Sequence, residues 1–460
     1  MSSSLPSPPP PSPELSIEER VRRRLRRRLL PYLMLLYVIA FLDRVNVNFA
    51  VLGMTKDLGF GPRDFGVGAG IFFLGYFLFE IPGTLIVERF GARRWIARIM
   101  VTWGAVAMSM AAVRTPSQFY GLRFLLGLAE AGFFPGIIVY LTHWFPARDR
   151  AKALGLFTAA IPVSNMLGAP LSGLILERHW AGMAGWRWLF ILEGAPAVLL
   201  GIVTLFVLTD RPSAARWLPE DEKAWLVARL DEEGRARRQV GPHRFLAALG
   251  DRRVWLLALA FFLIVVPTYG IQLWVPQIVK EASGLSAWEV SRVVGAGYLL
   301  GLPSLLLFGW SSDRTGERRW HAVLPMLLLA AGLVVTAGLE HRFPAIVLGL
   351  VIAGAGLNAH LPAFWALPPQ FLAGQAAAGS VGLINSIGNL GGFVGPTLVG
   401  ALKEGRSSYA PGMLALAGFA VAAAVIIGLV RTPPAAFTGS QGAVMLRAHR
   451  RDDDEDLPQQ

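Results

Sequence analysis

The chain has 460 residues, of which 54% are hydrophobic and 16% are charged, with a formal net charge of +12 and no cysteine. Soluble proteins carry about 25% charged residues, so this composition argues against a soluble enzyme and favours a protein surrounded by lipid. The lack of cysteine excludes disulfides, thiol catalysis and cysteine-bound metals. The basic residues lie between hydrophobic runs, which indicates a membrane-topology signal and not a nucleic-acid partner.

The N-terminal half of the chain contains one polar segment and then a series of apolar runs. Residues 1–29 are rich in Ser and Pro and then basic, and we expect a disordered cytoplasmic N-terminus without a cleavable signal peptide. Each later run approaches the roughly 20 residues that a helix needs to cross a bilayer. We expect six spans within 30–208, near 30–53, 65–87, 95–113, 119–141, 153–176 and 188–208.

A hydrophilic stretch at 209–253 separates this half from a second one. Within it, Trp225, Leu226 and Leu230 recur at helical spacing and predict a surface helix against the bundle, the alternative being a solvated tether. A cytoplasmic tail is expected at 431–460, with a disordered acidic run at Asp452–Asp456. The second half covers 254–430, with six spans expected near 254–277, 290–311, 322–339, 344–366, 376–400 and 411–430.

The distribution of Lys and Arg predicts the orientation. If the N-terminus is cytoplasmic, 30 of the 43 Lys and Arg lie in cytoplasmic segments, nine in outside loops and four in or near spans. This asymmetry follows the positive-inside rule. We therefore expect an all-α protein of the plasma (bacterial inner) membrane, with about twelve transmembrane helices and both termini in the cytoplasm.

A short motif occurs once in each half. The sequence reads Glu88-Arg-Phe-Gly-Ala-Arg-Arg-Trp95 after the second span and Asp313-Arg-Thr-Gly-Glu-Arg-Arg-Trp320 after the eighth. Two such matches, six spans apart, indicate a duplicated architecture.

This repeat resembles the signature loop of the major facilitator superfamily, G-x-x-x-D-R-x-G-x-R-R. The second copy fits from Gly309 to Arg319, whereas the first has Glu88 in place of Asp and Gly83 one residue too early. In that family the loop connects two pseudo-symmetric six-helix halves and favours the outward-open state. The resemblance thus implies a conformational latch formed by Glu88, Arg89, Gly91, Arg93, Asp313, Arg314, Gly316 and Arg318.

Three further segments resemble the anion:cation symporter branch of that family: Leu42–Asn48, Arg123–Gly136 and Leu383–Gly392. The segments Phe79–Pro82 and Phe364–Pro368 resemble its tartrate/phthalate-type members. That branch carries small organic anions such as sugar acids, tartrate and phthalate, usually together with protons. The resemblance implies similar roles at the matching positions of this chain.

Few charged residues lie inside the expected spans, and such residues are costly in lipid and often functional. A guanidinium matches a carboxylate and stays charged, so we expect Arg44 to bind the substrate. A buried carboxyl group near an arginine can exchange a proton near neutral pH, so Asp43 and Glu130 are the candidate proton sites. Arg123 lies two turns from Glu130 and is the expected switching partner. The alternative is a buried ion pair that only fixes helix packing.

The second half offers mainly neutral polar candidates. Asn385 and Asn389 lie on one helical face and either bind substrate or bond between helices. His360 is either a functional polar residue or a buried histidine of the core. Glu80 is expected near the cytoplasmic end of its span, where it could pair with motif arginines. The other expected substrate-binding residues are Asn165, Tyr269 and Gln272.

These features together predict a proton-coupled symporter that takes up a small carboxylate by alternating access. The alternatives are a transport-like sensor and an efflux carrier of organic anions. The seven histidines show no metal-like spacing, and we find no phosphate loop or nucleophile elbow, so we expect neither enzyme activity nor a cofactor nor a metal. The expected partners are the organic anion, protons and the lipid bilayer, with the protein a monomer.

Overall fold

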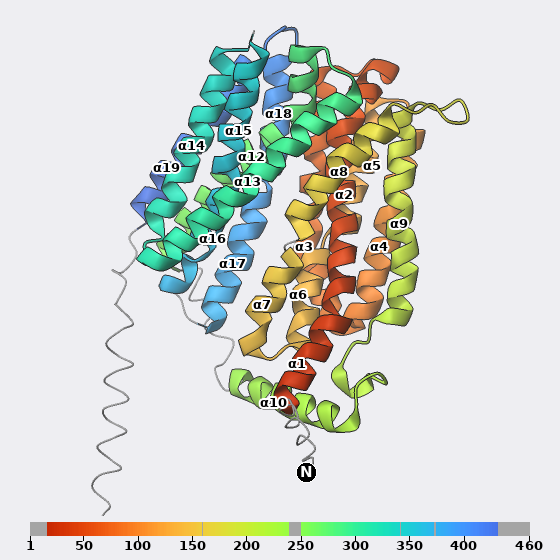
Figure 1. Ribbon diagram of the computed structural model, residues 1–460, viewed down its shortest axis with the longest axis vertical. Coiled ribbons are helices and arrows are strands. Elements are labelled where there is room, and N and C mark those ends of the chain that lie inside the picture. Colours follow the sequence, from red (N-terminus) through yellow and green to blue (C-terminus); the bar gives the residue numbers. More distant parts are fainter. Residues whose placement is uncertain (1–15, 159, 239–249, 341, 372–373, 431–460) are drawn as a thin grey trace, which may run out of the picture.

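The computed structural model describes residues 16–158, 160–238, 250–340, 342–371 and 374–430. The described residues form helices and no β-sheet, which confirms the all-α prediction. Two helical bundles lie side by side, α1 to α9 in the first half and α12 to α19 in the second, and α10 lies across one end of the first (Figure 1).

The first half contains the helices expected between residues 30 and 208. The expected fourth span, 119–141, is interrupted because Gly132 has a φ of 88°, a left-handed conformation that glycine adopts readily. The helices of this half are α1 (Ile17–Arg28), α2 (Leu30–Leu58), α3 (Pro62–Phe90), α4 (Ala92–Ser109), α5 (Pro116–Glu130), α6 (Phe133–Trp144), α7 (Ala147–Thr158), α8 (Ala160–Leu176) and α9 (Gly185–Val207).

The second half repeats this plan after the central segment. Its expected spans near 344–366 and 376–400 are each divided into two helices. The central segment contains α10 (Glu220–Arg238). The helices of the second half are α12 (Arg252–Ser283), α13 (Ala287–Thr315), α14 (Arg319–Gly338), α15 (Phe343–Ala359), α16 (Leu361–Trp365), α17 (Gly374–Asn389), α18 (Gly391–Lys403) and α19 (Ala410–Leu429).

Eight helical segments of the described chain are long and apolar enough to cross a membrane. The other four expected spans are also helical: α3, α13, the pair α7 and α8, and the pair α17 and α18. The structure thus provides a helix or helix pair for every span expected from the sequence.

The N-terminus differs from the expectation of disorder over 1–29. Residues 1–15 lie outside the described chain, but Ile17–Arg28 form α1, which starts with a capping box between Ser16 and Glu19. Val21 and Leu25 on α1 are buried. The predicted surface helix is present as α10, and its Leu226 is fully buried. The acidic tail at 431–460 lies outside the described residues.

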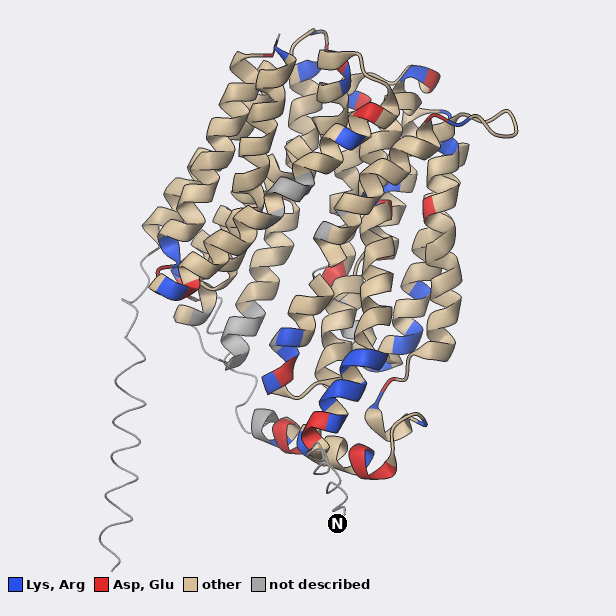
Figure 2. Ribbon diagram, in the orientation of Figure 1, with Lys and Arg blue, Asp and Glu red and all other residues tan. Residues whose placement is uncertain are grey.

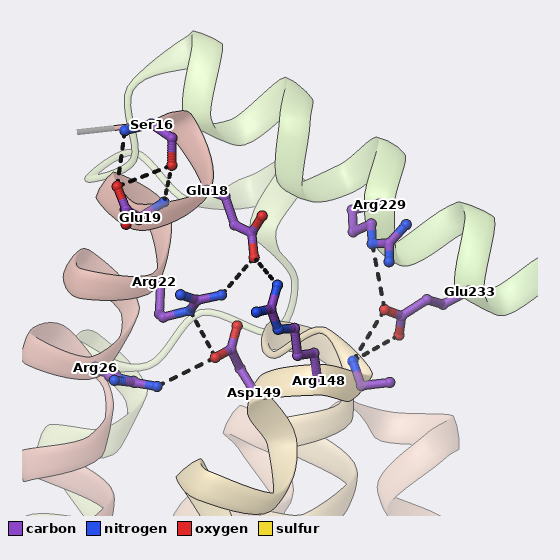
Figure 3. A network of polar contacts seen from close by, with 10 residues as sticks. Ser16, Glu18, Glu19, Arg22, Arg26, Arg148, Asp149, Arg229 and Glu233 are labelled. Carbon is purple, nitrogen blue, oxygen red and sulfur yellow. Dashed lines mark hydrogen bonds and ion pairs between the residues drawn. The ribbon is translucent and has the colours of Figure 1, made fainter. Parts of the chain in front are cut away.

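Ion pairs tie α1 and α10 to the start of α7 (Figure 3). Arg22 and Arg26 of α1 both contact Asp149 of α7, at 2.8 and 3.3 Å. On α10, Glu233 accepts from the backbone N–H of Ala147 at 3.0 Å. Arg24 of α1 contacts Glu222 of α10 at 2.8 Å. These contacts make α10 part of the first half.

The two halves touch most closely at the end of the bundle far from α1 and α10. We call the end with α1 and α10 the basic end, because Lys and Arg gather there (Figure 2), and the other the opposite end. At the opposite end, a Cβ added at Gly66 of α3 would lie 2.5 Å from the carbonyl oxygen of Pro396 on α18.

Candidate functional site

The first group of the site is an arginine bound to a buried carboxylate. Arg44 lies near the middle of α2, and its guanidinium donates to Oε1 of Glu130. Glu130 is 1% exposed and is the last residue of α5, just before the break at Gly132. Aromatic rings of Phe41, Phe72 and Tyr76 lie within 5.8 Å of the Arg44 guanidinium carbon. The pair is therefore held in a largely apolar, aromatic surrounding.

Asp43 has a different set of partners although it precedes Arg44 in the chain. Successive helical residues point about 100° apart, so the two side chains meet different helices. Asp43 is 1% exposed and accepts from Asn46 Nδ2 at 2.9 Å and from the indole N–H of Trp103 on α4. Asp43 thus faces the interior of the first half, and Arg44 contacts α5 and α3.

Arg123 is buried beside this cluster and binds backbone oxygens. Its Nε and Nη2 donate to the carbonyls of Gly68 and Ala69 on α3, at 3.3 and 3.2 Å. Its guanidinium carbon lies 4.9 Å from the Phe72 ring centroid. Glu130 is thus paired with Arg44, while the described hydrogen bonds of Arg123 go to backbone oxygens.

Glu193 of α9 is a buried acid that the sequence analysis did not single out. Its Oε1 accepts from Ser172 Oγ at 3.0 Å. Its Oε2 is buried and has no hydrogen-bond partner among the described residues. The signal was present in the sequence, because Glu193 is an acid within the expected span 188–208.

Glu80 lies one helical turn beyond Tyr76 on α3, and its described hydrogen bonds come from the second half. Its carboxylate accepts from Asn385 Nδ2 at 3.0 Å, from Ser386 Oγ at 3.0 Å and from Asn389 Nδ2 at 3.5 Å. Asn385 and Asn389 thus share one face of α17, as expected. The structure gives Glu80 these partners across the two halves, and a pairing with the motif arginines is not among its described contacts.

The remaining substrate-binding candidates are spread over the second half and α8. The Tyr269 ring of α12 lies 4.3 Å from that of Phe73 on α3, so it meets the first half near Arg44. Gln272 lines a pocket between α12, α13 and α15, inside the second half, and so lies apart from this cluster. The side chain of Asn165 lies outside the described part. His360 is buried at the junction of α15 and α16, against Phe364.

The two motif loops are both at the basic end, and their described contacts remain within their own halves. The backbone N–H of Arg93 donates to Asp210 at 2.8 Å, in the segment after α9. In the second copy, Arg318 donates to Asp313 at 2.5 Å. The guanidinium groups of Arg89 and Arg314 lie over Phe90 and Trp310. Gly91 and Gly316 have left-handed φ values of 84° and 69°. The side chain of Glu88 is not described.

Comparisons with known proteins agree on the family. A model of the Major Facilitator Superfamily matches residues 33–396 and 298–444. The chain is 49% identical over 420 residues to a protein named "Putative tartrate transporter" from Agrobacterium vitis, covering 91% of this chain and 96% of the relative. It is 40% identical over 405 residues to a quinolone resistance transporter of Acinetobacter baumannii, covering 88% and 92%.

A solved structure of similar fold is a bacterial homologue of the human lysosomal transporter Spinster, in an inward-facing and unoccupied conformation. It has a TM-score of 0.73 and 18% identity, and the match covers 89% of this chain and 96% of that one. Because its identity is so low, it supports the fold alone. From the family match and the relatives, the chain is an integral membrane transporter, not an enzyme, and it belongs to the Major Facilitator Superfamily, in the branch of organic anion transporters.

Proposed function

We propose that this protein is a proton-coupled symporter that takes up a small carboxylate, with Arg44 as the anion-binding group and Glu130 as a proton site. The observation that carries the proposal is the buried contact between these two side chains. A carboxylate already occupies the guanidinium, so a substrate carboxylate fits the same place by charge and shape. The 49% identical relative named for tartrate supports the class of substrate.

Proton coupling follows from competition at Arg44. While Glu130 is ionised, it neutralises the guanidinium and disfavours a second anion. Protonation of Glu130 removes that competitor, so that the substrate carboxylate takes its place on Arg44. Asp43 is a second proton site in this proposal, and Arg123, now on backbone carbonyls, supplies positive charge nearby. Release of the protons restores the Arg44–Glu130 pair and expels the anion.

The orientation in the membrane is part of the proposal. The basic end is assigned to the cytoplasm, because the Lys and Arg excess collects there. The tight contacts at the opposite end then close the path to the outside in this conformation. Transport requires the halves to part at that end and approach each other at the motif loops, by rocking about the site. The assignment places both termini in the cytoplasm of a bacterial cell, with the protein in the inner membrane.

Uptake into proteoliposomes tests the function. Purified protein is reconstituted, and radiolabelled tartrate, galactonate, phthalate and hydroxyphenylacetate are offered with and without an inward proton gradient. We expect the gradient to drive accumulation of one of them, and a protonophore to abolish it. Folded protein that accumulates none of these acids would contradict the proposal and favour a sensor or an efflux carrier.

Efflux is the second candidate, because a 40% identical relative is named for quinolone resistance. A quinolone carries a carboxylate on an aromatic body, and the rings around Arg44 suit such a body. The discriminating measurement is export of a fluorescent quinolone from cells that express the protein. Energy-dependent export without carboxylate uptake would favour efflux.

A further inference from the structure

The groups best placed to bind an anion in the two halves are both occupied by the protein's own carboxylates. In the first half Glu130 holds Arg44. In the second half Asn385, Ser386 and Asn389 present two amides and a hydroxyl on one face of α17, and all three donate to Glu80. Glu80 is 6% exposed, so this contact is buried.

The two pairs belong to one continuous region. Tyr76 and Glu80 lie on the same face of α3, four residues apart, which is about 6 Å along the helix axis. The Tyr76 ring lies 5.5 Å from the Arg44 guanidinium carbon. A small molecule bound at Arg44 would lie beside Tyr76, one helical turn from Glu80 and its donors on α17.

We infer that Glu80 is an internal competitor for the substrate: its carboxylate holds the α17 donors until an oxygen-rich group at the far end of the substrate replaces it. This inference rests on the proposed function and narrows it. The substrate carries a carboxylate for Arg44 and a second oxygen acceptor, a carboxylate or hydroxyl, for Asn385 and Ser386. Tartrate and galactonate meet this requirement, and phenylacetate does not.

The alternative is that Glu80 only fastens α3 to α17. The chemistry of the donors argues for exchange. Neutral amides and a hydroxyl can bind any carboxylate or hydroxyl of similar position, whereas an arginine would hold Glu80 with a fixed opposite charge. The donors also come from the half that must move relative to α3 during transport. A contact that is made and broken in each cycle is suited to a ligand-controlled exchange.

Equilibrium binding to the purified full chain tests this inference separately from transport. Wild type and Glu80→Gln are titrated with tartrate, galactonate and phenylacetate, with tryptophan fluorescence as the readout. Glutamine holds the α17 donors more weakly than a carboxylate does. If Glu80 occupies the donors about nine-tenths of the time, the apparent affinity of the wild type for the substrate is lowered about tenfold. We therefore expect Glu80→Gln to bind tartrate or galactonate about tenfold more tightly than the wild type. Phenylacetate affinity should not change.

Two further variants complete the test. Gly382→Ala lies on α17 with no atom within 4 Å of the added Cβ, and it should bind like wild type. Asn385→Ala removes a donor and should weaken tartrate or galactonate binding. This variant replaces Glu80→Gln as the test if Glu80→Gln does not fold. If the Glu80 contact is purely structural, Glu80→Gln should have a lower melting temperature and unchanged affinities for tartrate and galactonate.

The outcomes separate this inference from the proposed function. Unchanged tartrate and galactonate affinity in folded Glu80→Gln, or no binding of either acid to any variant, would overturn the role of Glu80. Absent uptake by wild type, with the Glu80-dependent binding intact, would overturn symport and leave the role of Glu80 standing.

Discussion

Glu130 is placed on Arg44 by the chain itself, since α5 ends at this residue and the turn at Gly132 follows. In Glu130→Gln the neutral amide no longer competes for the guanidinium and cannot carry a proton. We expect gradient-driven uptake to fall to background while exchange of internal for external substrate persists. Both activities are measured in the same proteoliposomes. The control is Glu232→Gln, an exposed acid on α10, and equal loss of uptake and exchange in Glu130→Gln would count against the role of Glu130.

Glu193 depends on Ser172 for its described hydrogen bond. Ser172→Ala leaves a buried carboxyl oxygen without that donor, which costs about 1–3 kcal/mol. We expect a lower melting temperature in detergent. Ser164→Ala is the matched control, because Ser164 is equally buried but donates to the carbonyl of Ala160 in its own helix. Equal melting temperatures for both variants would show that the bond to Glu193 adds no stability.

At the residue scale, the sequence identified the right kind of residue but not its partner. Burial of Asp43, Arg123 and Glu130 follows from their place in apolar runs, and the rule that selected them applies to Glu193 as well. Which way each side chain points depends on helix rotation and packing. That Glu80 meets Asn385, 305 positions away, is decided by how the two halves dock, and one sequence carries no record of that.

At the scale of the helices, α3 and α18 approach each other closely because the residue of α3 at the contact is a glycine, which has no Cβ. A Cβ at Gly66 would lie 2.5 Å from the Pro396 carbonyl oxygen, so Gly66→Ala forces the helices apart. Such overpacking costs about 1–3 kcal/mol and should favour conformations open at the opposite end. We expect faster maleimide labelling of a Thr397→Cys reporter in Gly66→Ala; the chain has no cysteine of its own.

The control is Gly418→Ala on α19, where the added Cβ has no atom within 4 Å. It should leave the labelling rate at that of the reporter alone. A labelling rate that is the same with and without Gly66→Ala would mean that the seal at the opposite end does not depend on the close approach of α3 and α18.

The N-terminus of α12 carries an acidic cap, so we expect the stability of the protein to depend on pH there. Asp251 caps this helix by accepting from the Arg253 N–H at 2.8 Å, and its bond to the Arg253 side chain lowers the pKa of Asp251. Because the pKa of Asp251 is lower in the folded state, its carboxylate stabilises the fold at pH values above its ordinary pKa of 3.8. This stabilisation is lost as the pH falls through the pKa of Asp251 in the folded state. Asp251→Asn keeps a cap but cannot ionise.

We therefore expect Asp251→Asn to be less stable than wild type at pH 7, by at most about 1 kcal/mol because the pair is partly exposed. The difference should vanish as the solution is acidified below the lowered pKa. Melting temperatures from pH 7 downward measure it, with Glu232→Gln as the control. A constant difference at every pH would show that the charge on Asp251 is not its source.

Helix positions were largely predictable from apolar runs, and helix breaks were not. The run at 119–141 is mostly apolar on both sides of Gly132 and was expected as one span, whereas the structure changes direction at this residue. Conversely, residues 1–29 were expected to be disordered, although Val21 and Leu25 are spaced to bury one face of a helix. Long-range ion pairs to Asp149 and Glu222 keep that helix in place.

At the scale of the whole molecule, α10 belongs to the first half although it lies in the connection between the halves. Its described ion pairs to other helices are to α1 and to residues at the start of α7. A rocking motion should therefore carry α10 with the first half as one body. The motif loops make their described contacts within their own halves, so they do not resist this motion in the present conformation.

Spin-label distances test this movement in the cysteine-free chain. Labels at Asp231→Cys on α10 and Arg94→Cys in the first motif loop lie on one half, and their distance should stay constant when the carboxylate accumulated in the uptake assay is added. Labels at Asp231→Cys and Trp320→Cys span the two halves, since Trp320 is exposed at the start of α14, and their distance should shift. Pulsed electron paramagnetic resonance measures both. A change of the same size in both pairs would mean that α10 moves independently of the first half, and no change in either would contradict rocking about the site.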